Sequence, residues 1–343
     1  MFFASDNTSG AAPEIMAAVL RANEGYQKSY GADAVMDRAR ALVREVLEAP
    51  EAAVHLVPTG TAANALSLAI CCPPWGAVFC HEHAHIAEDE CGAPEFYTNG
   101  AKLVLVGGSH GRMTPETLGA RLATTGESGV HGVQRAVLSI TNVTEAGTVY
   151  TPFEVAALAA QARARGLSVH LDGARFANAL VATGATPAEM TWKAGVDVLS
   201  FGGTKNGCLG VEAVVIFDPA KAWEFELRRK RAGQLFSKHR YLSAQIEAYL
   251  TDGLWLRLAA RANTMGRRLA DGLAAMPGVT QKHLVAANMM FPEWPHGGHA
   301  RAQGAGAIYY NWGAPEGREG ARLVTSWCTQ EADVDAFCTA LSA

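Results

Sequence analysis

Features that would assign this chain to a specialised class are scarce. The first ten residues have neither the positive charge nor the long apolar stretch of a secretory signal peptide. No apolar run reaches the roughly 18 residues that a membrane helix needs, and the nearest candidate, residues 65–80, is interrupted by Pro73 and Pro74. We therefore expect a protein that is neither secreted nor inserted in a membrane.

The sequence also lacks a disulfide framework and a dominant sign of charge. The seven cysteines are an odd number without the spacing of a disulfide framework, and Cys71 and Cys72 are adjacent. Such cysteines are typical of reduced, mostly buried thiols, which predicts a cytoplasmic protein. The formal net charge is only −4, so the overall charge does not favour nucleic acid or a membrane surface as a partner.

Alternating helices and strands are predicted for the first 250 residues or so. Apolar residues make up 49% of the 343-residue chain, which is typical of a globular protein with one large or two smaller domains. Helical spacing of apolar residues predicts helices over 13–22, 34–47, 61–71 and 152–165. Apolar runs predict strands over 77–80, 102–106, 135–140, 167–171, 196–200 and 212–217. This order indicates an α/β fold with a mostly parallel sheet.

The pattern changes in the last quarter of the chain. A long helix is predicted over 254–275, followed by strands over 284–290, 307–310 and 321–326 and a long loop over 292–306. We therefore expect a large domain over 1–248 and a smaller C-terminal α+β domain over 249–343.

A glycine-rich turn displays one lysine at the end of a predicted strand. Residues 200–207 read Ser-Phe-Gly-Gly-Thr-Lys-Asn-Gly, with the lysine at position 205. Glycines let a ligand approach the backbone closely, and a lysine that forms an imine must lose its proton easily. Lys205 is therefore a candidate nucleophile, although a surface lysine in a flexible turn would give the same pattern.

A carboxylate marks the end of a second predicted strand. Residues 170–175 read His-Leu-Asp-Gly-Ala-Arg, and Asp172 falls where the strand over 167–171 ends. Ligands of open α/β sheets bind beyond the carboxyl ends of strands, where a carboxylate can keep the ring nitrogen of a pyridoxal cofactor protonated. Arg175 would then lie near the cofactor, unless Asp172 is a helix cap and Arg175 a surface residue.

A turn of small residues, Thr59-Gly60-Thr61, opens a predicted helix. Free backbone N–H groups and the helix dipole at such a start can bind a phosphate group, and the Thr61 hydroxyl adds another donor. The turn matches neither the dinucleotide-binding pattern nor the Walker pattern. A plainly capped helix is the alternative interpretation.

Three histidines alternate in the segment His81-Glu82-His83-Ala84-His85. On an extended segment they would share one face, so a zinc site is one interpretation. With a pyridoxal cofactor, one imidazole would stack on the ring and the other two would be ordinary polar residues. No metal is expected in that case.

Together these segments resemble the low-specificity L-threonine aldolases, which are pyridoxal 5'-phosphate (PLP) enzymes of the aspartate-aminotransferase-like fold, fold type I. The likeness covers nearly the whole chain and follows the family's order. The matching motifs are Ser5-Asp6-Asn7-Thr8, Tyr30-Gly31-Ala32-Asp33, Gly60-Thr61-x-x-Asn64, His85-Ile86 with Glu90 and Gly92, His170-Leu171-Asp172-Gly173-Ala174-Arg175, Lys205, and Arg322-Leu323-Val324-Thr325.

The resemblance implies a PLP-dependent transferase-like fold and a role for each matching residue. Lys205 would carry the cofactor as a Schiff base, with His85 and Asp172 as the other catalytic residues. The implied cofactor-binding residues are Gly60, Thr61, His85, Asp172, Arg175, Lys205 and, toward a neighbouring subunit, Lys238. The implied substrate-binding residues are Ser5, Tyr30, Arg175 and Arg322.

The implied reaction is retro-aldol cleavage of L-threonine, L-allo-threonine or a related β-hydroxy-α-amino acid to glycine and an aldehyde. His85 is the leading candidate base, because a neutral imidazole suits proton transfer near neutral pH. Residues 141–147, Thr-Asn-Val-Thr-Glu-Ala-Gly, hold no histidine where many family members have one, so a second catalytic histidine has no candidate. A β-eliminating lyase or a transaminase of the same fold, or a non-catalytic metal-binding protein, are the alternatives.

The resemblance also implies a homotetramer, a dimer of dimers, with active sites at subunit interfaces. The basic run Arg228-Arg229-Lys230-Arg231, with Lys238 and Arg240, could by itself indicate a nuclear signal or a nucleic-acid patch. In the family the matching helix and loop lie at a subunit interface. We therefore expect an amino-acid substrate and copies of the same chain as partners, and no nucleic acid or membrane.

Overall fold

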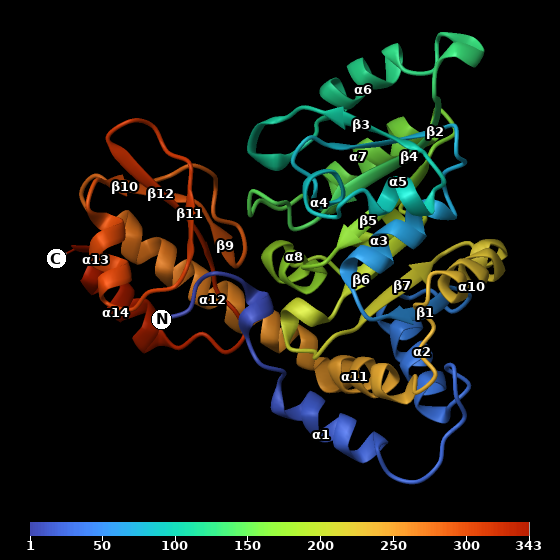
Figure 1. Ribbon diagram of the computed structural model, residues 1–343, viewed down its shortest axis with the longest axis horizontal. Helices are drawn as coiled ribbons and strands as arrows, with labels where there is room; N and C mark the ends of the chain where they lie inside the picture. Colours follow the sequence, from blue (N-terminus) through green and yellow to red (C-terminus); the bar gives the residue numbers. More distant parts are fainter. Residues whose placement is uncertain (343) are drawn as a thin grey trace.

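A seven-stranded sheet forms the centre of the larger of two units (Figure 1). The computed structural model describes residues 1–342. The strand order is β1-β7-β6-β5-β4-β2-β3, and only β7 runs antiparallel to its neighbours. The strands are β1 (Ala53–Val57), β2 (Gly76–His81), β3 (Lys102–Val106), β4 (Gln134–Thr141), β5 (Ser168–Gly173), β6 (Val198–Gly202) and β7 (Glu212–Ile216).

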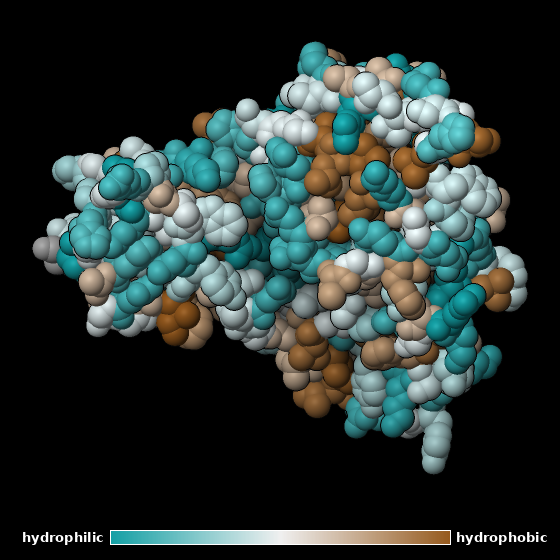
Figure 2. Space-filling view, turned by 45° about the horizontal axis from the view of Figure 1, so that its top comes forward, coloured by the Kyte–Doolittle hydropathy of each residue, from teal (hydrophilic) through white to brown (hydrophobic). Residues whose placement is uncertain are grey.

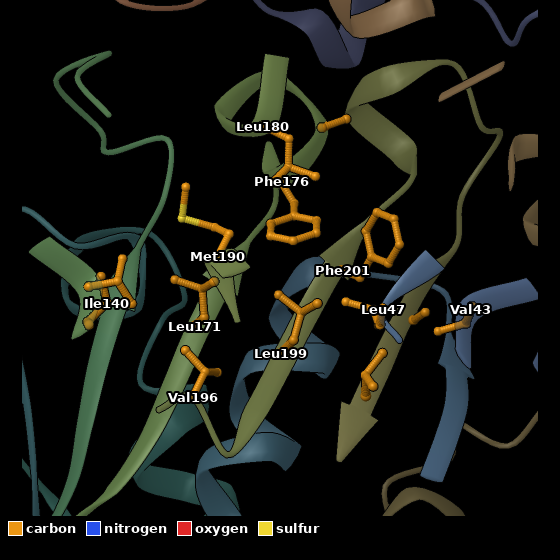
Figure 3. Close-up of a cluster of buried hydrophobic side chains, with 14 of the residues drawn as sticks. Val43, Leu47, Ile140, Leu171, Phe176, Leu180, Met190, Val196, Leu199 and Phe201 are labelled. Atoms are coloured by element: carbon orange, nitrogen blue, oxygen red, sulfur yellow. The ribbon is translucent and has the colours of Figure 1, made fainter. Parts of the chain in front are cut away.

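Both faces of the inner strands of this sheet are buried, as in β2, β6 and β7, which explains why these strands are continuous apolar runs in the sequence. In β6, Leu199 and Phe201 point into the main core, whereas Val198 belongs to a second cluster on the opposite side. Figure 3 shows the main core, where Phe176 and Met190 pack over Leu171 and Leu199.

Helices surround the sheet and complete what we call the large unit. Their first turns carry recurring caps, as at α7, where Thr151 and Glu154 form a reciprocal capping box behind Pro152. The α-helices are α1 (Pro13–Ala22), α2 (Ala34–Val46), α3 (Gly60–Ala69), α4 (His85–Glu88), α5 (Ala93–Tyr97), α6 (Pro115–Thr124), α7 (Pro152–Arg163), α8 (Phe176–Thr183), α9 (Pro187–Met190), α10 (Ala222–Arg231) and α11 (Arg240–Leu250). Short 3-10 helices are η1 (Asp6–Thr8), η2 (Ser109–Gly111), η3 (Gly129–His131), η4 (Trp192–Ala194), η5 (Thr204–Asn206), η6 (Pro219–Lys221) and η7 (Thr251–Gly253).

A smaller antiparallel sheet forms the second unit, which we call the small unit. Its order is β11-β12-β10-β8, with β9 also paired to β12. The elements are β8 (Thr280–Gln281), β9 (Met289–Met290), β10 (Pro292–Pro295), β11 (Tyr310–Trp312), β12 (Arg318–Val324), α13 (Gly298–Gly304) and α14 (Glu331–Ser342).

One long helix, α12 (Leu254–Ala274), joins the two units (Figure 1). Its first turns place Trp255 in the core of the large unit, and its last turns place Leu269 in the core of the small unit. Phe3, at the other end of the chain, also packs into the core of the small unit. The division at residues 248 and 249 stays a prediction. No helix among residues 1–342 has the length and apolar character needed to cross a membrane.

Most expected elements of the large unit are confirmed to within a few residues, but β1 was not predicted. In the small unit, the long loop expected over 292–306 is wrong, because this segment contains β10 and α13. The prolines of β10 lie at its two ends, where a strand tolerates them. The first residue of α13, Gly298, has no room for a side chain, because a Cβ at this position would lie 2.2 Å from Cδ1 of Trp294.

Two expected strands of the small unit are also wrong in extent. The strand expected over 284–290 is limited to Met289 and Met290, and the strand expected over 307–310 begins only at Tyr310. Pairing with β12 selects these few residues, so their extent depends on a partner strand that the local sequence does not specify.

Candidate active site

A cavity of about 240 Å³ brings together five of the ten residues for which the sequence predicts a role. Lys205 and Asp172 both line it, although 33 residues separate them in the sequence. The lining residues are Asn7, Pro58, Thr59, Gly60, Thr61, Asn64, His85, Asp172, Ala174, Thr204, Lys205 and Glu212. An amine, a carboxylate, an imidazole and a helix start therefore face one space.

The parallel part of the sheet explains this convergence. Asp172 lies near the end of β5, and Lys205 lies in η5, just after β6. Gly60 begins α3 after β1, and His85 begins α4 after β2. These four strands run in the same direction, so their carboxyl ends meet at one edge of the sheet, where such folds bind ligands.

Two fixed donors hold the Asp172 carboxylate. Its Oδ1 accepts a hydrogen bond from the Ala174 backbone N–H at 3.0 Å, and its Oδ2 accepts one from Asn64 Nδ2 at 2.9 Å. The same Asn64 nitrogen donates to Glu90 Oε1 at 2.8 Å. Asp172, which is 2% exposed, is thus oriented toward the cavity by groups that leave it little freedom.

His85 forms a close pair with a buried carboxyl group. Its Nδ1 lies 2.9 Å from Glu90 Oε1, and the Glu90 side chain is fully buried. This hydrogen bond raises the pKa of His85 above its usual value, and burial raises the pKa of Glu90. The pair therefore retains a shared proton to a higher pH than two isolated groups would.

The other two histidines of the alternating segment lie elsewhere. His81 Nε2 is 2.9 Å from the Gly108 carbonyl oxygen, and His83 pairs with the exposed Glu88. Within residues 1–342, no group of three or more His, Cys, Asp or Glu side chains is arranged to hold a metal ion. The zinc interpretation of this segment thus receives no support from the geometry.

The start of α3 presents open backbone donors to the cavity. Thr59 caps the helix, and its Oγ1 accepts a hydrogen bond from the Ala62 N–H at 3.1 Å. In the part of the chain that the structure describes, the N–H groups of Gly60 and Thr61 donate to no protein acceptor. A Cβ built on Gly60 would meet nothing within 4 Å. Such a helix start suits a phosphate group.

Arg175 is held in a buried ion pair that the sequence did not predict. Its Nε and Nη2 donate to the two oxygens of Asp6 at 2.7 and 2.9 Å, and both side chains are at most 2% exposed. Asn288 Nδ2 also donates to Asp6 at 3.1 Å. Burial alone would raise the pKa of Asp6, but the adjacent Arg175 guanidinium holds it below its usual value.

Ser5 and Arg322 lie beside this pair and outside the cavity lining. Arg322 Nη1 donates to the Ala4 carbonyl oxygen at 3.2 Å, and Ser5 Oγ accepts from the Asn7 N–H at 3.2 Å. Burial and the nearby Arg175 lower the pKa of Arg322. The residues expected to bind a substrate carboxylate are therefore grouped around the N-terminal segment, and their roles stay predictions.

Tyr30 and Lys238 lie together, but they do not line the cavity of their own chain. The Tyr30 N–H donates to the carbonyl oxygen of Ser237 at 3.0 Å, next to Lys238. The Tyr30 side chain is half-exposed and lies under Lys230, whose Nζ is 4.8 Å from the ring centroid. Their roles at a cofactor or substrate site therefore stay predictions.

Asp6, Glu90 and Glu212 were not predicted as functional residues. Asp6 and Glu90 belong to motifs noted in the sequence, but nothing there indicates their partners. Glu212 begins an apolar strand, where a carboxylate is unusual. It is 6% exposed, and its Oε2 accepts a hydrogen bond from the Gly203 N–H at 2.9 Å. The unusual position of Glu212, an acidic residue at the start of a buried strand, is the sequence feature that could have identified it as a functional residue.

Comparisons with known proteins agree with this geometry. A family model described as beta-eliminating lyase matches residues 3–293. A low-specificity L-threonine aldolase from Pseudomonas sp. strain NCIMB 10558 is 43% identical over 97% of this chain and 94% of its own length.

Solved structures give the same assignment. Leishmania major threonine aldolase superposes with a TM-score of 0.94 at 30% identity, covering 99% of this chain and 98% of that one. Sphingomonas wittichii serine palmitoyltransferase, at 14% identity and a TM-score of 0.71, covers 100% of this chain and 86% of its own and shares the fold. The predicted fold class is thereby confirmed. The chain belongs to the beta-eliminating lyase family and, within it, to the low-specificity L-threonine aldolases.

Proposed function

We propose that the protein is a PLP-dependent aldolase that cleaves L-threonine, L-allo-threonine or a related β-hydroxy-α-amino acid into glycine and an aldehyde. The single observation that carries the proposal is that Lys205, Asp172, His85 and the start of α3 line one cavity. Relatives named low-specificity L-threonine aldolase, and the general dependence of these families on PLP, support it.

The chemistry of the donor groups fits this cofactor. The free N–H groups of Gly60 and Thr61 suit a phosphate, and the buried Asn64 Oδ1 has no hydrogen-bond partner among residues 1–342. Lys205 has no carboxylate within 4.0 Å among the same residues, so its amine is not held in an ion pair. PLP supplies an electron sink for a carbanion at Cα of the substrate.

Each residue has a defined task in this proposal. The Lys205 amine would hold the cofactor covalently, and the Asp172 carboxylate would keep its ring nitrogen protonated. His85 removes the proton of the substrate β-hydroxyl, directly or through a water molecule. Arg322 and Ser5 bind the substrate carboxylate, for which the guanidinium fork is suited. Arg175 supports this site through its bond to Asp6.

Beta-elimination is the second candidate, because the matching family model carries that description. The two reactions differ in the bond that breaks. Aldol cleavage of threonine releases glycine and acetaldehyde, whereas elimination releases a 2-oxo acid and ammonia. Assaying all four products after incubation with L-threonine and with L-serine separates the candidates.

We further propose that the protein is a homotetramer, a dimer of dimers, in which Tyr30 and Lys238 of one subunit serve the cavity of its neighbour. Their position beside each other and away from their own cavity supports this arrangement. Apolar patches are exposed on the face seen in Figure 2, and exposed Phe96 and Leu227 line a groove of about 640 Å³. Such surfaces mark interaction sites.

A cytoplasmic location stays a prediction from the cysteines, all seven of which are free.

The test of the proposed function is the variant Lys205→Ala. We expect wild-type protein to be yellow with bound PLP and to produce equal amounts of glycine and acetaldehyde from L-threonine. Lys205→Ala should lose both the visible absorbance and the activity. Lys193→Ala, which removes a surface lysine paired with Glu48, should keep both. Activity retained in Lys205→Ala would refute the assignment.

A further inference from the structure

Glu212 lies between the two segments that would hold the ends of the cofactor. It is the first residue of β7 and pairs in register with Val57 of β1 on one side and Gly202 of β6 on the other. Val57 directly precedes the Pro58-Thr59-Gly60 turn, and Gly202 directly precedes Gly203-Thr204-Lys205. The carboxyl group is therefore at the junction of the phosphate-binding turn and the lysine loop, and it lines the cavity itself.

This carboxyl group is buried without a cation to neutralise it. It is 6% exposed, and no lysine, arginine or histidine of the described chain lies within 4.0 Å of it. Burial raises the pKa of Glu212 to about 7, while hydrogen bonds from Thr204 and Gly203 and the positive charge of Lys205 act in the opposite direction. At pH 8 the free protein thus holds this group mainly as a carboxylate.

The titratable groups that face Glu212 are few. Lys205 and Asp172 face it from the cavity, and Cys208 and Tyr249 face it from the protein side. Burial raises the pKa of the Cys208 thiol and of the Tyr249 phenol well above their usual values, so both are neutral at pH 8. Of Glu212, Cys208 and Tyr249, Glu212 is therefore the group whose pKa lies closest to neutral pH.

A phosphorylated ligand changes this balance. A phosphate monoester carries close to two negative charges above pH 7, and a like charge in the same buried cavity raises the pKa of a carboxyl group. The backbone N–H groups at the start of α3 cannot titrate and favour the ionised form of the phosphate, so the added negative charge acts on the Glu212 carboxyl group in the same cavity.

We propose that Glu212 takes up one proton from solvent when the phosphorylated cofactor binds and stays a neutral carboxylic acid in the complex. The inference rests on the proposed function, because it takes PLP as the ligand of this cavity. The balance is one carboxylate, one solvent proton and one cofactor on one side, and the protonated complex on the other. Glu212 is a binding and positioning residue, because its Oε2 also fixes the Gly203 N–H of the lysine loop.

The proposal has a definite sign with respect to pH. A group that is ionised in the free protein and protonated in the complex makes binding weaken as pH rises above its free pKa, by up to about tenfold per pH unit. Glutamine at this position still accepts the Gly203 hydrogen bond but cannot titrate. A purely structural role for Glu212 would thus be preserved in Glu212→Gln, and proton uptake would not.

The experiment measures proton uptake with a ligand that cannot react with lysine. Pyridoxine 5'-phosphate, which lacks the aldehyde, is titrated into full-length cofactor-free protein at pH 8 by calorimetry in two buffers of different ionisation enthalpy. We expect wild-type protein to take up close to one proton more per bound ligand than Glu212→Gln. The control Glu51→Gln, at an exposed position, should match wild type.

The inference is overturned if wild type and Glu212→Gln take up the same number of protons per bound ligand. It is also overturned if wild type takes up almost none, and this second result does not depend on whether the variant folds. Infrared difference spectra of the wild type provide an independent measurement, in which a protonated carboxyl band must appear when the ligand binds. If the protein binds neither PLP nor pyridoxine 5'-phosphate, the proposed function itself fails. A yellow, active enzyme without proton uptake would refute the role of Glu212 alone.

Discussion

Two histidine–glutamate pairs follow β2 with the same spacing but in opposite surroundings. His85 and Glu90 form one pair, and His83 and Glu88 form the other, each with Nδ1 2.9 Å from Oε1. The Glu90 side chain is fully buried, whereas that of Glu88 is 50% exposed. Water screens the outer pair, so only the inner carboxylate can strongly affect the protonation of its histidine.

Replacing Glu90 by Gln should therefore change the pH dependence of catalysis. The raised pKa of His85 depends first on its hydrogen bond with Glu90, so removing the carboxylate lowers this pKa. A base that works as neutral imidazole then becomes active at lower pH, and the acid limb of the kcat/KM profile moves to lower pH. Glu88→Gln should leave the limb in place. The same displacement in both variants, or one to higher pH in Glu90→Gln, would contradict this role of Glu90.

Residue identity at strand ends was enough to predict part of the site. Lys205 and Asp172 stand just after or at the end of a predicted apolar strand, and parallel strands bring their ends to one edge. Gly60 was predicted instead from the helix start, because the strand before it was missed. The bond between Asp6 and Arg175 spans 169 residues and depends on packing between distant segments, which no local pattern contains. Glu90 likewise could be recognised as part of a motif but not as the partner of His85.

At the scale of elements, α12 connects the two units through a close contact. A Cβ at Gly266 would lie 2.8 Å from the Ala287 carbonyl oxygen and 3.2 Å from Cα of Asn288. Both neighbours are backbone atoms and cannot move aside cheaply. Since Asn288 donates to Asp6, a shift of this segment would also disturb the Asp6–Arg175 pair.

Gly266→Ala should consequently destabilise the protein by about 1–3 kcal/mol, as expected for overpacking, and raise KM for the amino-acid substrate. Gly304→Ala, in an exposed part of α13 where a Cβ meets nothing within 4 Å, should stabilise it by about 0.5–1 kcal/mol. Denaturation midpoints at one protein concentration measure both effects. Equal and small changes in the free energy of unfolding of the two variants would show that α12 can shift to accommodate a Cβ at position 266.

The two sheets differ in how far sequence could predict them. Strands such as β6, buried on both faces, appear as unbroken apolar runs, and their positions were predicted to within a few residues. Strands such as β9, with two residues, have too few positions to show a period. Their extent is set by the neighbouring β12 strand, which is a tertiary property.

At the scale of the whole molecule, the N-terminal segment links the two units. Phe3 is fully buried in the core of the small unit, with its ring centroid 5.2 Å from that of Phe337. Four residues later, Asn7 lines the cavity. The position of Asn7 at the cavity therefore depends on packing in a core that contains none of the cavity residues.

Phe3→Ala should cost about 3–5 kcal/mol of stability, as for other large-to-small changes in a core, and should raise KM more than it lowers kcat. The adjacent Phe2 is 60% exposed, so Phe2→Ala should change stability by no more than about 0.5 kcal/mol. Chemical denaturation and steady-state kinetics measure both. An unchanged KM in Phe3→Ala would show that substrate binding does not depend on the packing of Phe3 in the core of the small unit.

Asp6 bonds simultaneously to Arg175 of the large unit and to Asn288 of the small unit. A hinge that swung the units apart would have to break a charged hydrogen bond on one side or the other, in surroundings without water to replace it. Asp6 thus ties the large unit to the small unit. An amino-acid substrate must therefore reach Lys205 by a route that leaves the two units in contact.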